Sequence, residues 1–184
     1  ICSNEKGETS NLGRGGSDYS AAIYAKYLNA KVLEIWTDVS GVFSANPKIV
    51  KNASPIEFLS YKEAMELSFF GAKGIYFPTL QPLIEDNIPV FIKNTFEPNA
   101  EGTCISNSTK LDNDEIVKGI SHIENISILN FEGSGMVGVP GFSKRFFEAL
   151  SSNQINVVMI TQASSEFSIC IAIDSNDAEV AKQV

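Results

Sequence analysis

The first part of the chain alternates between helical and strand-like spacing of its apolar residues. A glycine-rich turn at residues 13–16 leads into Ala and Tyr residues at helical spacing, which predicts a helix that starts near Ser17 and is capped by Ser17 or Asp18. The β-prone run 31–37 follows and ends in the polar loop 38–41. This order of loop, helix, strand and loop favours an α/β fold.

The same alternation continues to residue 106. Ser-Tyr-Lys-Glu at residues 60–63 is a capping-box sequence, and the apolar residues behind it predict a helix. A second helix is expected after Pro78, and the apolar runs 89–93 and 102–106 predict two buried strands.

Residues 107–115 read NSTKLDNDE and contain one large apolar side chain, so we interpret them as a linker. They separate a first domain, residues 1–106, from a second domain, residues 116–184.

The second domain has the pattern of a ferredoxin-like unit. Its predicted elements are a strand around 126–131, a Gly/Pro loop at 133–141, a helix over 142–150, a buried strand at 157–160, a half-buried antiparallel strand at 167–174, and a helix from Asn176 or Asp177. The order βαββα is most of a βαββαβ unit, with its last strand absent.

Composition excludes several classes of function. The 184 residues carry 14 Lys and Arg against 22 Asp and Glu, a net charge of -8, which disfavours nucleic acids and anionic membranes as partners. No apolar run approaches the ~20 residues that span a bilayer. The 3 cysteines are far apart and lack metal-ligand spacing, so we expect core thiols in a cytoplasmic protein and no metal site.

The start of the chain suggests a fragment. It opens at Ile1, not at Met, and residues 4–8 have the sequence of a hairpin turn whose first strand we expect to be missing.

The turn at residues 13–18 could hold an anion. Its glycines allow close approach of the backbone, the helix N-terminus favours negative charge, and Arg14 can form two parallel hydrogen bonds to a carboxylate or phosphate. A tight turn with a surface arginine fits the local pattern equally well, because the six residues complete neither GxGxxG nor a P-loop.

Other polar residues are ambiguous when taken alone. Asp38 follows a strand, where it could bind a ribose or an adenine amine, although an ordinary Asx-turn explains it better in isolation. Lys73 could reach a phosphate or complement a helix C-terminus. His122, on an apparent strand, has no matching nucleophile or ligand and receives no catalytic role.

Seven segments in order resemble the aspartate kinases, most closely the kinase part of the bifunctional aspartokinase/homoserine dehydrogenases. They are NEKGE at 4–8, LGRGGSDYSAA at 12–22, EIWTDVSGVF at 34–43, SYKEAMELSFFGAK at 60–73, IKNTFEPNAEGT at 92–103, VKGIS at 117–121 and VVMITQASSEFSI at 157–169. The resemblance implies the C-terminal half of an amino-acid-kinase α/β/α sandwich, followed by an incomplete ACT domain.

The resemblance also implies a reaction, in which ATP phosphorylates the side-chain carboxylate of L-aspartate. Arg14 would hold the α-carboxylate of the substrate, with Ser17 and Asp18 shaping its pocket, and Arg14 and Asp18 would be the catalytic residues. The residues implied to bind the nucleotide are Thr37, Asp38, Phe43, Lys48, Lys73 and Gly74. Mg²⁺ is implied by the ATP chemistry, although no ligand for it is legible.

The sequence departs from the family pattern in places. Phe43 stands where Tyr is frequent, Lys48 where Arg is frequent, and the segment 76–78 where a His-Pro is usual. The KFGGTS-like lysine motif of the family is not among these residues, so we expect little or no turnover from them alone.

The second domain is implied to bind L-threonine as a feedback effector and to pair subunits in a homodimer or larger homo-oligomer. The residues implied for the effector are Gln162, Val139, Pro140, Gly141, Val158 and Ile160. Gln162 taken alone would be an exposed strand-end residue. Two alternatives stay open: a module that only binds effector and dimerises, and another amino-acid kinase of the same fold, such as one acting on glutamate.

Overall fold

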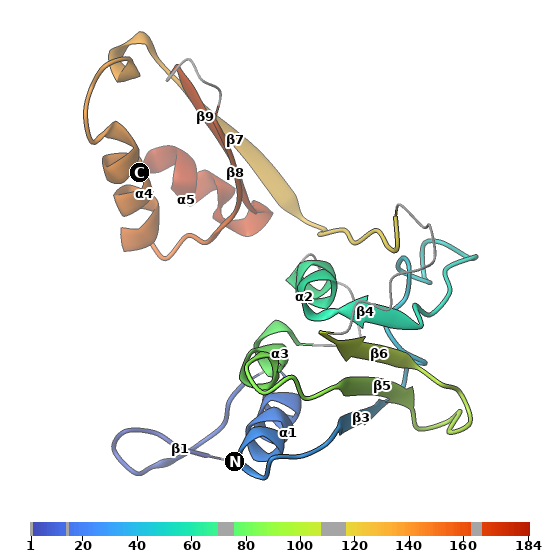
Figure 1. The fold of residues 1–184 in the computed structure, drawn as a ribbon. Helices are drawn as coiled ribbons and strands as arrows, with labels where there is room; N and C mark the ends of the chain where they lie inside the picture. The colour runs from blue at the N-terminus through green and yellow to red at the C-terminus, as the bar shows by residue number, and fades with distance from the viewer. Residues whose placement is uncertain (1, 14, 70–75, 108–116, 163–166) are drawn as a thin grey trace. The chain divides into compact units, whose positions relative to one another are not determined.

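A computed structural model describes residues 2–13, 15–69, 76–107, 117–162 and 167–184. The chain forms two compact units, Ile1–His122 and Ile123–Val184 (Figure 1). In the described part of the chain, no helix has the length and apolar character needed to cross a membrane.

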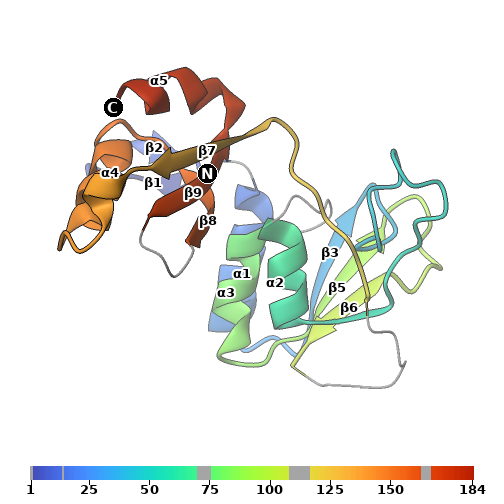
Figure 2. The same ribbon diagram turned by 90° about the horizontal axis from the view of Figure 1, so that it is seen from above.

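The first unit contains a four-stranded mixed sheet and three helices. Its elements are β1 (Cys2–Ser3), β2 (Thr9–Ser10), α1 (Gly16–Tyr27), β3 (Leu33–Thr37), β4 (Phe58–Ser60), α2 (Tyr61–Phe69), α3 (Phe77–Ile84), β5 (Val90–Asn94) and β6 (Thr103–Ser106). The sheet order is β3-β5-β6-β4, with β3 parallel to β5, β4 parallel to β6, and β5 antiparallel to β6. The helices lie along one face of the sheet, and α3 contacts both α1 and α2 (Figure 2).

The core of this unit lies between the sheet and the helices. In β5 every second side chain is buried, namely Val90, Ile92 and Asn94, because alternate residues of a strand face the same side. The helices contribute small residues such as Ala22 and Ala25, which let α1 pack closely. The predicted α/β class and the strands at 31–37, 89–93 and 102–106 are confirmed.

The starts of α2 and α1 agree only in part with the predicted caps. The capping box is confirmed: the Glu63 N–H donates to Ser60 Oγ over 3.2 Å, and the Ser60 N–H donates to Glu63 Oε2 over 2.8 Å. The predicted cap of α1 was wrong, because Gly15, in the left-handed conformation with φ 72°, occupies the N-cap. The first strand of the N-terminal hairpin, expected to be missing, is present as β1 and pairs with β2.

Residues that follow the predicted linker contact the first unit. Lys118 Nζ lies 3.0 Å from a carboxylate oxygen of Glu63, and the Ile120 N–H donates to the Ser44 carbonyl over 2.8 Å. His122, expected on a strand, lies outside the regular elements. The linker at 107–115 falls almost wholly outside the described residues, so the domain limits 1–106 and 116–184 stay a prediction.

Tyr61 ties α2 to the segment before β5, and we expect this contact to make the first unit sensitive to alkali. Its hydroxyl donates to the Ile88 carbonyl over 2.6 Å, and burial raises the pKa of Tyr61 from 10.0 to about 12. A pKa raised by folding contributes stability that is complete below pH 10 and is lost as the pH rises through 12. Tyr61→Phe should therefore flatten the alkaline decline and lower stability at neutral pH by about 1–2 kcal/mol.

Urea unfolding between neutral pH and pH 12 measures both effects. Tyr27→Phe is the matched control, because the Tyr27 side chain is 80% exposed. An unchanged alkaline decline in Tyr61→Phe would contradict this role of the hydroxyl.

The second unit is an antiparallel sheet with two α-helices. Its elements are β7 (Ile126–Glu132), the 3-10 turn η1 (Ser134–Met136), α4 (Phe142–Ser152), β8 (Val157–Gln162), β9 (Ser168–Asp174), the 3-10 turn η2 (Ser175–Asp177) and α5 (Ala178–Gln183). The sheet order is β7-β9-β8, the arrangement expected of a ferredoxin-like unit.

In the central strand β9, Ile169, Ile171 and Ile173 are buried as predicted, but Ala172, which belongs to the opposite face, is buried as well. The prediction of a buried strand at 157–160 was wrong, since Met159 is 47% exposed and Ile160 55% exposed. The reason is that β8 has one neighbour, β9, among the described strands. The three cysteines are half-buried and are not core residues, contrary to the prediction.

Candidate active and effector sites

The glycine loop before α1 forms the first part of the candidate active site. Gly13 and Gly15 both have positive φ, 73° and 72°, and the Gly16 N–H donates to the Gly13 carbonyl over 3.2 Å. The loop therefore turns tightly into the N-terminus of a 12-residue helix, whose first N–H groups favour an anion. The Ser17 hydroxyl donates to Asp18 Oδ1 over 3.1 Å. Arg14 lies outside the described residues.

Tyr76 packs on this loop from the start of α3, a contact that the sequence did not predict. A Cβ added at Gly15 would lie 2.3 Å from Tyr76 Cγ, so only glycine leaves room for the ring. The contact joins the N-terminus of α1 to that of α3. Lys73 and Gly74, which precede Tyr76 in sequence, lie outside the described residues.

The second part of the site is the carboxyl edge of two parallel strands. Thr37, the last residue of β3, is the register partner of Asn94, the last residue of β5. The Thr37 hydroxyl donates to Asp38 Oδ1 over 3.2 Å, and the Asp38 side chain is exposed. Open α/β sheets usually bind ligands at the carboxyl ends of their parallel strands.

Chain direction brings the two parts to the same end of the unit. α1 leads directly into β3, and α3 leads directly into β5, so each helix runs back along the strand that follows it. The N-termini of α1 and α3 and the carboxyl ends of β3 and β5 therefore lie at one edge (Figure 2). This arrangement can offer helix N–H groups to anions and an exposed carboxylate to hydroxyl or amine groups.

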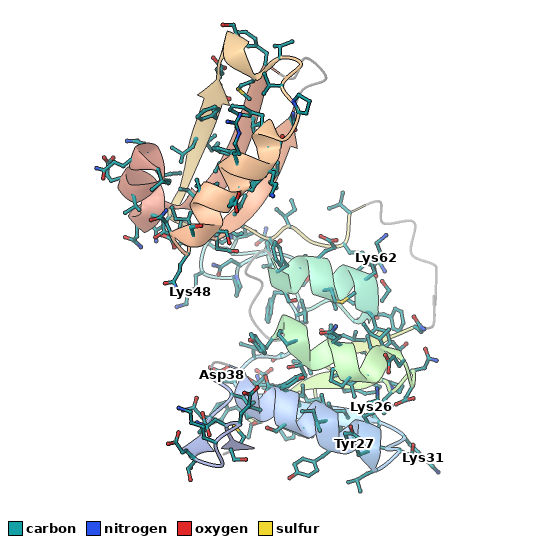
Figure 3. The ribbon with its side chains drawn as sticks, turned by 90° about the vertical axis from the view of Figure 1, so that its left-hand side faces the viewer. Lys26, Tyr27, Lys31, Asp38, Lys48 and Lys62 are labelled. Atoms are coloured by element: carbon teal, nitrogen blue, oxygen red, sulfur yellow. The ribbon has the colours of Figure 1, made fainter. Side chains whose placement is uncertain are left out.

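The segment that follows Asp38 in sequence is held by hydrogen bonds to a buried threonine, Thr103. The Val42 N–H donates to Thr103 Oγ1 over 2.8 Å, and the Thr103 hydroxyl donates to the Ile56 carbonyl over 2.6 Å. Phe43 is half-buried and pairs with Pro55 in an isolated bridge, while Lys48 is exposed (Figure 3). Phe43 and Lys48, two of the predicted nucleotide-binding residues, thus lie on a loop that is anchored to β6.

A hydrogen-bond chain at the same edge was not predicted. Asn94 Nδ2 donates to Ser40 Oγ over 2.8 Å, and the Ser40 hydroxyl donates to Glu97 Oε2 over 2.7 Å. Asn94 is 7% exposed, which makes it one of the few buried polar side chains described in this unit. Its position at the end of an apolar strand was the only sequence signal for it.

The second unit has a cavity of about 350 Å³, with both polar and apolar groups in its lining, beside the N-terminus of α4. Its lining residues are Met136, Gly138, Val139, Pro140, Gly141, Phe142, Ser143, Gln162 and Ile169. Four predicted effector residues therefore line one cavity: Gln162 and the consecutive residues Val139, Pro140 and Gly141, from which Gln162 is distant in sequence. Val158 and Ile160, the other two, lie on β8 outside this lining.

The aromatic residues of α4 pack with β7. The rings of Phe131 and Phe142 have centroids 5.5 Å apart, and those of Phe131 and Phe146 are 5.1 Å apart. They border a second, more apolar cavity of about 450 Å³ between β7, α4 and α5. Phe142, Phe146 and Phe147 pack against the core of the unit from the helix predicted over 142–150.

No group of His, Cys, Asp and Glu side chains that could hold a metal ion occurs within the described ranges.

Comparisons with known proteins agree with this architecture. Residues 1–94 match the model of the amino acid kinase family, and residues 129–184 match a model of the ACT domain. Over 181 residues the chain is 50% identical to a bifunctional aspartokinase/homoserine dehydrogenase of Haemophilus influenzae, covering 98% of this chain and 22% of that protein. It is 37% identical over 175 residues to the lysine-sensitive aspartokinase 3 of Escherichia coli, covering 95% and 38%.

Solved structures give the same result. The structure of E. coli aspartokinase III in complex with aspartate and ADP matches with a TM-score of 0.80 at 35% identity, over 94% of this chain and 38% of that one. The lysine and aspartate complex of the same enzyme matches with a TM-score of 0.70 at 33% identity, over 94% and 38%. The chain thus spans between about a fifth and two fifths of the length of these relatives.

Proposed function

Since the chain belongs to the amino acid kinase family, we propose that the protein containing it transfers the γ-phosphoryl group of ATP to the side-chain carboxylate of L-aspartate, giving 4-phospho-L-aspartate. The observation that carries this proposal is that the glycine loop, packed against Tyr76, and Asp38 lie at the same end of the sheet. They do so in a chain that is 50% identical to a bifunctional aspartokinase/homoserine dehydrogenase over 98% of its length. Such an edge can bring a dianionic amino acid and a polyphosphate together.

The glycine loop is the proposed aspartate side of the site. Arg14 holds the α-carboxylate in a forked pair of hydrogen bonds, and the N–H groups at the start of α1 add a positive potential. Ser17 and Asp18, already hydrogen-bonded to each other, shape the pocket and orient cationic groups toward the substrate.

The strand edge is the proposed nucleotide side. Asp38 accepts hydrogen bonds from ribose hydroxyls or the adenine amine, and Thr37 holds its carboxylate in place. Phe43 offers a ring face, while Lys48 and Lys73, with Gly74 beside it, neutralise phosphate charge together with Mg²⁺ brought by ATP.

The activity is assigned to the longer protein. The lysine motif that the family carries near its N-terminus is not among these 184 residues. We therefore expect that the chain alone turns over little or no substrate.

The second unit is proposed to regulate the kinase by binding L-threonine in the cavity that Gln162 lines, and to pair subunits in a homo-oligomer. An alternative is that the effector is lysine, which the E. coli aspartokinase III structure contains. A second alternative is that these residues serve only to bind an effector and to dimerise. Calorimetry of the chain with ATP and with L-threonine separates an effector module from a nucleotide-binding one.

Asp38→Asn in the intact protein tests the assignment of the nucleotide side. Losing a charged acceptor should raise the KM for ATP about tenfold and leave the KM for aspartate within about twofold, because Asp38 bonds only the nucleotide. Steady-state assay of aspartyl phosphate measures both. Asp86→Asn, an exposed aspartate between α3 and β5, is the control and should change neither. Equal losses for both substrates would contradict the assignment.

A further inference from the structure

The turn after β5 presents a phenylalanine to solvent. The Phe96 side chain is 80% exposed, the highest value among the described phenylalanines. Its N–H donates to Asn94 Oδ1 over 2.9 Å, and the Glu97 N–H donates to the Asn94 carbonyl over 3.2 Å. Hydrogen bonds to a buried asparagine, and not burial of the ring, therefore determine where Phe96 lies.

The same asparagine ties this turn to the loop that carries Asp38. The Thr95 N–H donates to the Thr37 carbonyl over 2.8 Å. Asn94 Nδ2 reaches Ser40 Oγ, which in turn donates to Glu97. Phe96 is two residues beyond the register partner of Thr37, and Asp38 is one residue beyond Thr37 itself. Both side chains thus extend from the same strand edge.

From these contacts we propose that Phe96 is a stacking platform for the base of the nucleotide whose ribose or amine Asp38 binds. An aromatic ring held on an ordered turn loses little conformational freedom when a planar base stacks on it. The hydrogen-bond chain from Asn94 through Ser40 to Glu97 fixes the spacing between the ring and Asp38. This inference rests on the proposed function and adds a base-binding residue to it.

The test compares ATP with inorganic tripolyphosphate, which has the phosphates but no base. In the intact protein, Phe96→Ala should lower the affinity for ATP about tenfold, which is the usual effect of losing one base–aromatic stack. The affinity for tripolyphosphate should not change. Phe96→Tyr should restore ATP affinity, because it keeps the ring face. Calorimetry gives the dissociation constants, and competition against ATP gives that of tripolyphosphate.

The control is Tyr27→Ala, since Tyr27 is also 80% exposed but ends α1 at the opposite end of the sheet. The inference is overturned if Phe96→Ala binds ATP within twofold of wild type, or if ATP and tripolyphosphate weaken equally. Wild-type protein that binds no ATP would overturn the proposed function as well. ATP binding that is independent of Phe96 would overturn this inference alone.

Discussion

Replacing Gly102 by alanine is expected to destabilise the first unit by more than about 3 kcal/mol, through left-handed strain plus a backbone clash. Gly102 has φ 73°, and an added Cβ would lie 2.0 Å from the Ile92 carbonyl oxygen and 3.1 Å from its carbon. Both are backbone atoms of β5, so relief requires β5 and β6 to separate. The expected loss therefore includes ladder pairs such as Ile92 with Thr103.

Gly7→Ala separates the clash from the strain. Gly7 has nearly the same φ, 77°, but nothing lies within 4 Å of its added Cβ, so this change should cost only about 1–2 kcal/mol. Urea unfolding of the two variants beside wild type measures the difference. If Gly102→Ala is no less stable than Gly7→Ala, the close approach of Gly102 to β5 is not a constraint on the fold.

Features encoded by neighbouring residues could be predicted from the sequence. The capping box at Ser60 needs only contacts three residues apart, and the alternation in β9 needs only a periodicity of two. Each is visible in a short window of sequence, and the elements around them formed as expected.

Features that depend on which strands are neighbours could not be predicted. The 157–160 run is as apolar as a central strand, but its exposure follows from the sheet order β7-β9-β8. The ring of Tyr76 on Gly15 joins residues 61 positions apart, and the bond from Asn94 to Ser40 spans 54. No local sequence pattern marks either pair, so neither contact could be predicted without the three-dimensional fold.

For a related reason, only some of the predicted effector residues line the cavity. Gln162 reaches the cavity because it ends β8 on the same face as its register partner Ile169, which is buried under the helices. The register shift between Val157 and Met159 changes which residues of this strand share a face. A sequence resemblance can indicate the strand, but it cannot locate such a bulge.

Gln162→Ala in the intact protein should remove most of the inhibition by L-threonine. The N-terminus of α4, where Gly141 has φ 78°, can supply N–H groups to the carboxylate of the proposed effector, and the Gln162 amide can both donate to and accept from its remaining polar atoms. Two lost hydrogen bonds of about 1 kcal/mol each correspond to an about 30-fold higher threonine concentration for half inhibition. Activity without threonine should be unchanged, because Gln162 belongs to the second unit.

Thr161→Ala is the matched control, because adjacent residues of a strand point to opposite faces and Thr161 does not line the cavity. Inhibition curves with threonine and with lysine, for wild type and both variants, measure the effect. Threonine can inhibit only if it binds the inactive arrangement of the kinase more tightly than the active one. A variant that binds threonine more weakly should therefore shift the equilibrium between the two arrangements less at a given threonine concentration. Undiminished threonine inhibition in Gln162→Ala would exclude this residue, and inhibition by lysine alone would exclude threonine as the effector.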